Sequence, residues 1–151
     1  MSAIGTTYSY KDLSGAMDSP AVGVPLVFGG QIGCDTITVT NDTQHGTKDI
    51  AADGTIMPTF VAGDGGTVTI VCQQTSVVHK YLLAWLNVLK TSAMNGDVSN
   101  WANTRMLLRS AIDGSSHDVE GIMPNKIPDK SYAANGQKIT WTLEACNIVS
   151  L

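Results

Sequence analysis

The residues that most often carry chemistry are few in this chain, and their spacing does not fit catalysis or metal binding. None of the histidines His45, His79 and His117 has a second histidine or a cysteine at a metal-ligand spacing. HExxH, CxxC, EF-hand, phosphate-loop and GxSxG patterns do not occur. His79 falls in the first turn of a predicted helix, where we expect a solvated side chain. A thiol–imidazole pair of Cys34 with His45 or His79 is the remaining catalytic combination, and many sequences contain one by chance. We therefore predict no enzyme activity, no metal and no cofactor.

The three cysteines cannot all pair within one chain. Cys72 and Cys146 lie in strand-like patterns, and we predict that both are buried free thiols. Cys34 lies in a glycine-rich turn and is predicted to be the most exposed. An intersubunit disulfide through Cys34 is the alternative in an oxidising environment.

Acidic residues are concentrated in the segment from Cys34 to Gly66. Its charged residues are Asp35, Asp42, Asp49, Asp53 and Asp64, with Lys48 as the only base. The segment therefore carries the whole formal net charge of −4. One interpretation is that the aspartates initiate turns, as Asp53 before Gly54 can. The other is that some of them line a surface that needs negative charge. A net negative chain does not fit a surface that grips nucleic acid.

This acidic segment is framed by two predicted strands and a helix. Residues 36–40 and 67–72 alternate between apolar and polar side chains, which predicts half-buried strands. Between them, residues 42–66 read as a long loop with several turn signals. Its apolar residues need a partner surface, and we take them as a candidate contact between copies: Ile56, Met57, Pro58, Phe60 and Val61. After the second strand, Val77–Lys90 has apolar residues at helical spacing, and Ser76 is placed to cap it.

The rest of the chain predicts further strands. Residues 8–13 and 22–27 are short strand candidates, the second at a sheet edge because of its prolines. Residues 103–112 and 116–123 flank the hairpin signal Asp113-Gly114. Residues 138–149 alternate, with Ile139 and Trp141 predicted inward. The fold class is therefore mainly β, an antiparallel β-sandwich or barrel with one flanking helix, in one domain of residues 1–151 with a flexible arm at 1–7.

Composition adds two expectations. Only 15% of the residues are charged, whereas about 25% is usual. Such a surface loses fewer hydrated ions when it is buried, which favours assembly with neighbours. We see neither a signal peptide nor an apolar run long enough to span a bilayer.

Several stretches resemble the tail tube proteins of contractile-tailed bacteriophages. They are Tyr8–Asp12 near the start, DTITVTN at 35–41, AADGTIM at 51–57, GGTVTI at 65–70 running into the helix, and ITWTLEA at 139–145. Their order and spacing fit that family over most of the chain. The Gly- and Pro-rich residues 15–33 and the segment 124–132 match nothing in it.

The resemblance implies a structural virion protein that assembles into stacked hexameric rings. The rings would form the inner tail tube, a conduit for DNA ejection into the host. The fold is shared with type VI secretion tube proteins. Implied partners are other copies, the sheath, the baseplate and the tape-measure protein, with DNA passing through without specific binding. The protein would be made in the bacterial host cytoplasm and reside in the virion tail.

A tube also suggests a role for the acidic segment. A carboxylate repeated around a ring creates a strong field in the lumen and repels DNA phosphates. We therefore predict that Asp42, Asp49 and Asp53 face the lumen. In such a tube, the apolar residues of the 42–66 loop named above are the candidate contact between stacked rings. Two alternatives remain, a baseplate or tail-terminator protein with the tube fold and a carbohydrate-binding β-sandwich. The second needs exposed aromatics, whereas Trp85 and Trp141 are predicted to be core.

Overall fold

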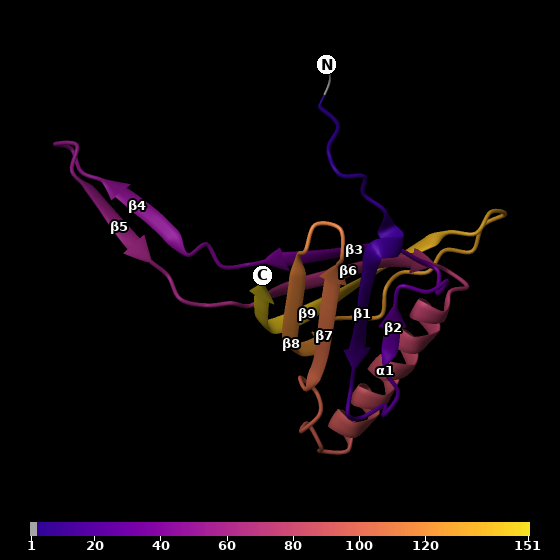
Figure 1. Cartoon of the computed structure of the whole chain (residues 1–151). Helices are drawn as coiled ribbons and strands as arrows, with labels where there is room; N and C mark the ends of the chain where they lie inside the picture. The colour runs from indigo at the N-terminus through magenta and orange to yellow at the C-terminus, as the bar shows by residue number, and fades with distance from the viewer. Residues whose placement is uncertain (1–2) are drawn as a thin grey trace.

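The structure is a computed structural model that describes residues 3–151 (Figure 1). Residues 1 and 2 of the predicted arm lie outside the described residues, and residues 3–8 are exposed and without regular structure. The elements in chain order are the 3-10 helix η1 (Tyr10–Asp12), β1 (Leu13–Asp18), β2 (Leu26–Phe28), β3 (Cys34–Asn41), β4 (Gly46–Ile50), β5 (Ile56–Phe60), β6 (Gly66–Gln73), α1 (Val77–Met94), β7 (Thr104–Ser110), β8 (Ser116–Pro124) and β9 (Lys138–Ser150).

Seven strands form one antiparallel sheet in the order β2-β1-β7-β8-β9-β6-β3, and β4 and β5 form a separate two-stranded hairpin. The sheet curls, so that β3 and β6 cross the direction of β1 and β7, and α1 runs beside β1 and β2 (Figure 1). The predicted class, mainly β and antiparallel with one helix, is confirmed. Of the two architectures left open, the curled single sheet is closer to a barrel.

The helix α1 covers the core because its apolar residues share one face. Ser76 caps it by accepting the backbone N–H of His79 at 3.1 Å. The buried residues of that face include Val78, Leu82, Trp85, Leu86 and Leu89. The indole N–H of Trp85 donates to the hydroxyl of Thr104 at 3.0 Å, which satisfies both polar groups inside the core. The helix was predicted correctly but runs four residues past Lys90, to Met94.

The alternating strand patterns give the rest of the core. In β6, Val68, Ile70 and Cys72 are fully buried, and in β9, Ile139, Trp141, Leu143 and Ala145 are buried as predicted. The opposite face of the sheet is rich in threonine. Thr38, Thr69 and Thr142 lie side by side across β3, β6 and β9. Local alternation therefore separated the core face from a hydroxyl-bearing outer face.

Two strand predictions need correction. Residues 8–13 were predicted as a strand, but η1 occupies Tyr10–Asp12, and β1 begins at Leu13 and runs into the Gly- and Pro-rich stretch. This stretch also holds the edge strand β2, shorter than predicted. The predicted loop at 42–66 is instead the β4–β5 hairpin, because its two short strands pair with each other and not with the sheet.

The cysteine predictions are right for Cys72 and wrong for the other two. Cys146 is exposed, because it follows the inward-facing Ala145 and so points to the opposite face of β9. It lies against Gly121, whose φ of 68° marks a bulge in β8, where a side chain would meet the Cys146 Cβ. Cys34 is half-buried rather than the most exposed, since it begins β3 and its Sγ lies 3.9 Å from the carbonyl oxygen of Val71.

Candidate assembly surfaces

The β4–β5 hairpin is closed by a turn whose residues suit it. The backbone N–H of Ala51 donates to the carbonyl of Thr55 at 2.8 Å, and Gly54 adopts a φ of 90°, which favours glycine. The Asp53 carboxylate accepts the Thr55 N–H at 3.0 Å. Hydrogen bonds from Thr55 hold the pKa of Asp53 below its usual value. Asp53 therefore does initiate a turn, and its carboxylate is exposed and charged.

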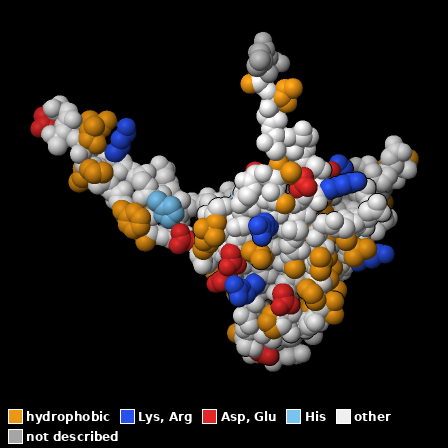
Figure 2. Space-filling view, in the orientation of Figure 1, with side chains coloured by type: hydrophobic (Ala, Val, Ile, Leu, Met, Phe, Trp, Pro, Cys, Tyr) orange, Lys and Arg blue, Asp and Glu red, His pale blue; other side chains and the backbone are white. Residues whose placement is uncertain are grey.

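Both faces of the hairpin carry apolar side chains, and every residue of its two strands is exposed. Ile50 lies opposite Ile56, and Asp49 lies opposite Met57. Among the candidate contact residues, the Phe60 side chain is 79% exposed and the Val61 side chain 39%. The hairpin projects far from the body, with hydrophobic side chains along it and an acidic one at its tip (Figures 1 and 2). Apolar surface held out in this way needs a partner.

His45 braces the base of the hairpin. Its Nδ1 lies 2.9 Å from the carbonyl oxygen of Val61, and its own carbonyl accepts the Val61 N–H at 2.8 Å. Its Nε2 lies 3.6 Å from an oxygen of Asp64, and its ring is nearly parallel to that of Phe60. These contacts hold the two segments of the hairpin together where they leave the sheet.

The three candidate lumen residues occupy two different places. Asp42 directly follows β3, and its N–H donates to the carbonyl of Gly65 at 3.1 Å, so it belongs to the end of the sheet. Asp49 and Asp53 lie on the hairpin. Because Asp49 shares a face with Met57, one hairpin face cannot serve both the lumen and an apolar contact between copies. The sequence analysis assigned all three aspartates to one lumen surface, whereas the structure places them on two separate parts of the molecule.

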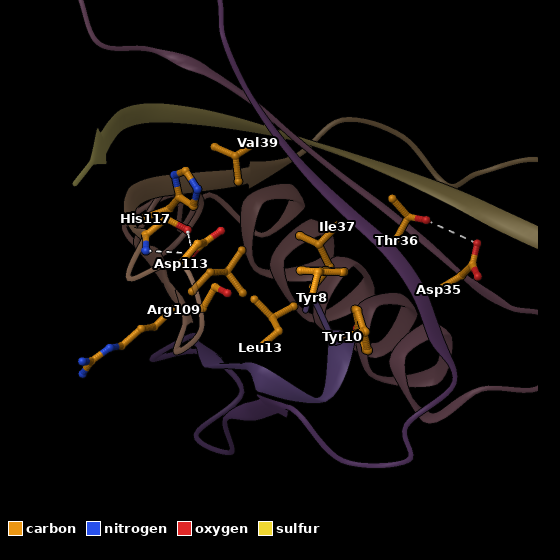
Figure 3. A pocket seen from close by; sticks show the side chains of 13 residues that line it. Tyr8, Tyr10, Leu13, Asp35, Thr36, Ile37, Val39, Arg109, Asp113 and His117 are labelled. Carbon is orange, nitrogen blue, oxygen red and sulfur yellow. Dashed lines mark hydrogen bonds between the residues drawn. The ribbon is translucent and has the colours of Figure 1, made fainter. Parts of the chain in front are cut away.

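A cavity of about 490 Å³ lies between β3 and the β1–β7 side of the curled sheet (Figure 3). Three of its titratable side chains already have partners in local structure, and one of them, Asp35, lies 3.1 Å from the Lys138 Nζ. Asp113 accepts the N–H and hydroxyl of Ser115 at 2.9 and 2.7 Å, which lower its pKa. His117 Nδ1 lies 2.8 Å from the Ser150 hydroxyl, and Arg109 points away from the cavity. No hydrogen bond joins two titratable side chains of this lining in the described chain, so the cavity shows no acid–base pair.

A second hollow, of about 370 Å³, opens beside α1. We call it the Trp101 groove, and its lining residues are Leu86, Lys90, Trp101, Pro124, Asn125, Lys126 and Ile127. Sequence reasoning missed it, because three segments far apart in the chain build it. The only local signal was Trp101 in a loop. Its lining is largely apolar, and its only charged side chains are two lysines.

The buried histidine belongs to the core. His79 was expected in solvent but is only 6% exposed, because its ring turns inward and accepts the Trp141 indole N–H at Nδ1, at 3.1 Å. Burial, with a smaller effect of Lys130, lowers the pKa of His79. Burial likewise raises the thiol pKa of Cys34. Neither His45 nor His79 hydrogen-bonds Cys34, so the structure does not form the thiol–imidazole pair considered above.

Residues 3–151 contain neither a metal-type cluster nor a membrane-spanning helix. No three His, Cys, Asp or Glu side chains gather as metal ligands would. No helix among these residues has the length and apolar character needed to cross a membrane. Trp85 and Trp141 are fully buried, as predicted, so they offer no aromatic platform for a sugar.

Comparison with known proteins identifies the class. The chain belongs to the Bacteriophage PhiTE tail tube protein family, whose sequence profile matches residues 5–151. This confirms the resemblance seen in the sequence. With its curled β-sheet and projecting hairpin, the chain is a tail-tube-like structural protein. No curated protein sequence matched it.

Three solved structures share its fold. The sheath/tube terminator of the extracellular contractile injection system PVC, in the extended state, aligns with a TM-score of 0.60 and 9% identity over 99% of both chains. A chain of the anti-feeding prophage baseplate aligns with 0.56 and 11% identity, over 100% of this chain and 97% of its own. A chain of the PVC sheath-tube complex in the extended state aligns with 0.54 and 10% identity, over 91% and 87%. At such identities the likeness concerns the fold.

Proposed function

We propose that this protein is the subunit of an inner tail tube, in which hexameric rings stack into a conduit for DNA ejection into the host. The observation that carries the proposal is the projecting hairpin. Every strand residue in it is exposed, including the apolar Ile56, Met57 and Phe60. A subunit that holds such a surface away from its own core is built to be covered by a neighbour.

Ring closure would use the edges of the curled sheet. The eight-residue strand β3 is an edge strand, so its outer backbone groups are free to pair with a neighbouring copy. Around a ring, such pairing joins the sheets into one wall. The threonine rows across β3, β6 and β9 would give that wall a wettable surface without a strong grip on DNA.

Asp42 is the strongest candidate for an acidic lumen residue, because it continues the threonine-bearing strand β3. Asp49 and Asp53 keep the lumen role only if the hairpin turns its Met57 face inward. Replacing each of the three by Asn tests this. Slower or salt-sensitive ejection from normally assembled tubes supports the lumen role. Impaired assembly instead assigns that aspartate to a contact between copies, and unchanged ejection removes it from the lumen.

The implied partners follow from the same proposal. The tube would lie inside a sheath, start from a baseplate and surround a tape-measure protein, with DNA passing through without specific binding. The compared structures support this assignment, since they come from a sheath/tube terminator, a baseplate and a sheath-tube complex. The protein would be made in the bacterial host cytoplasm and reside in the virion tail.

A tail-terminator role is the second candidate. The observation that favours it is that the PVC sheath/tube terminator aligns with a higher TM-score than the chain of the sheath-tube complex. Negative-stain electron microscopy across a concentration series of the purified protein separates the two. Hollow tubes of uniform width identify a tube subunit. Single rings that never stack identify a terminator, and a monomer at every concentration contradicts both self-assembling roles.

A further inference from the structure

The Trp101 groove combines an apolar floor with unpaired positive charge. Leu86, Trp101 and Ile127 supply apolar surface, and Lys90 and Lys126 are the only charged residues of its lining. Neither lysine has a carboxylate within ion-pair distance in residues 3–151. An apolar hollow whose lining includes two free ammonium groups fits a ligand that is itself apolar and acidic.

The tip of the hairpin has this chemistry. Ile50 and Ile56 form an exposed cross-strand pair at its outer end, 61% and 55% exposed. Asp49 precedes the pair and, opposite Met57, faces the other side of the hairpin, so a tip that enters a groove end-on presents the isoleucines to one wall and Asp49 to the other. Asp53 sits in the turn beyond the pair. Neither carboxylate has a basic partner within ion-pair distance among the described residues. The groove volume of about 370 Å³ equals that of about a dozen waters. The groove is therefore large enough for the side chains of Ile50 and Ile56.

The positions of the two surfaces require a second copy. The hairpin leaves the body at one side, and α1, which forms one wall of the groove, lies at the opposite side (Figure 1). A subunit therefore cannot insert its hairpin into its own groove. A contact between two different patches on opposite sides is head-to-tail, and such contacts generate closed rings or stacked filaments.

We propose that the Trp101 groove receives the tip of the β4–β5 hairpin from a second copy of this chain, with Lys90 and Lys126 facing Asp49 and Asp53. This inference rests on the proposed self-assembly and names its acceptor surface. The apolar pair contributes burial, and the charges set the register and disfavour other contacts. It assigns Asp49 and Asp53 to contacts between copies rather than to the lumen.

Charge exchange between the two surfaces tests the inference. The groove variant is Lys90→Glu/Lys126→Glu. The hairpin variant is Asp49→Lys/Asp53→Asn, which keeps an oxygen for the Thr55 N–H. Sedimentation velocity would measure the concentration at which each protein assembles. We expect each variant to need at least about tenfold more protein than the wild type, because like charges then meet. The protein that combines both variants should recover most of the loss.

The matched control is Lys11→Glu/Lys80→Glu, which makes the same change in net charge at exposed lysines outside the groove. It should assemble like the wild type, and a melting curve for each protein shows that it is folded. A groove variant that assembles normally overturns the inference and leaves the groove to another partner, while the tube proposal stands. Loss in both variants without recovery in the combined protein also overturns the pairing. A wild type that assembles at no concentration overturns the proposed function itself.

Discussion

Excising the hairpin is expected to abolish assembly while leaving the folded subunit at least as stable as before. The chain itself shows where to cut. A side chain placed on Gly63 would contact the Thr43 hydroxyl at 3.1 Å, so residues 43 and 63 are adjacent in space. Residues 44–62 can therefore be replaced by Asn-Gly, a two-residue connection that suits antiparallel strands. Asp64 stays in place, because its carbonyl accepts the Ile148 N–H at 2.8 Å.

The size of the stability change follows from loop closure. The connection between β3 and β6 shortens from roughly 24 residues to about 7, which favours folding by about 1 kcal/mol. An isolated two-stranded hairpin is at best marginally stable, so its removal costs the folded state little. The exposed contact between the His45 ring and the Asp64 carboxylate would be lost, and surface contacts of this kind are worth about 0–1 kcal/mol. The net expectation is a change in the free energy of unfolding between zero and about +1 kcal/mol, or a rise of at most about 4 °C in Tm for a chain of this size.

Differential scanning calorimetry and sedimentation velocity measure the two quantities on the same sample. The unexcised protein, at the same concentration, is the control for assembly. A fall in Tm of more than about 5 °C would refute the reasoning about stability, because the hairpin would then be packed into the core. Tubes formed by the excised protein would refute its role in assembly.

Three further predictions concern the core and the surface thiol. Burial lowers the pKa of His79 below its usual 6.5, so the unfolded state takes up a proton first as the pH falls. The contribution of neutral His79 to the free energy of unfolding should therefore be fully present above about pH 6.5 and be lost as the pH falls below it. Denaturant titrations over a pH series measure this decline, and the His79→Gln variant should show less of it. Gly66→Ala would press a methyl group against the carbonyl oxygen of Thr40 and should cost about 1–3 kcal/mol in urea unfolding, whereas Gly46→Ala, with open space around it, should be close to neutral. A thiol reagent should modify Cys146 faster than the other two cysteines, and equal rates for all three would contradict its exposure.

The helix and the inner face of β9 were predictable because their information is local. An amphipathic helix repeats every 3.6 residues and a half-buried strand every two, so the apolar positions mark the face that turns inward. The same rule, applied strictly, places Cys146 outside, since it follows the inward-facing Ala145. That error came from treating any cysteine in a strand pattern as buried.

His79 shows where local information ends. Its place in the first turn of α1 was known from the sequence, but its burial depends on Trp141, which is 62 residues away in the chain and donates the hydrogen bond that makes burial tolerable. The Trp101 groove is a similar case, because α1, the loop after it and the end of β8 each supply part of the lining.

The sequence by itself determined the class of fold, the helix, the inward faces of the strands, the acidic segment and the resemblance to tail tube proteins. Each of these depends on the order and spacing of neighbouring residues. Only the tertiary structure decided that residues 42–66 form a free hairpin, that Asp42 is separated from Asp49 and Asp53, and that an apolar, basic groove lies against α1, the helix on the side of the body opposite that hairpin. The physical reason is that alternation specifies which face of an element is apolar but not what covers it. The covering surface comes from contacts between distant parts of the chain or, for the hairpin, from another molecule.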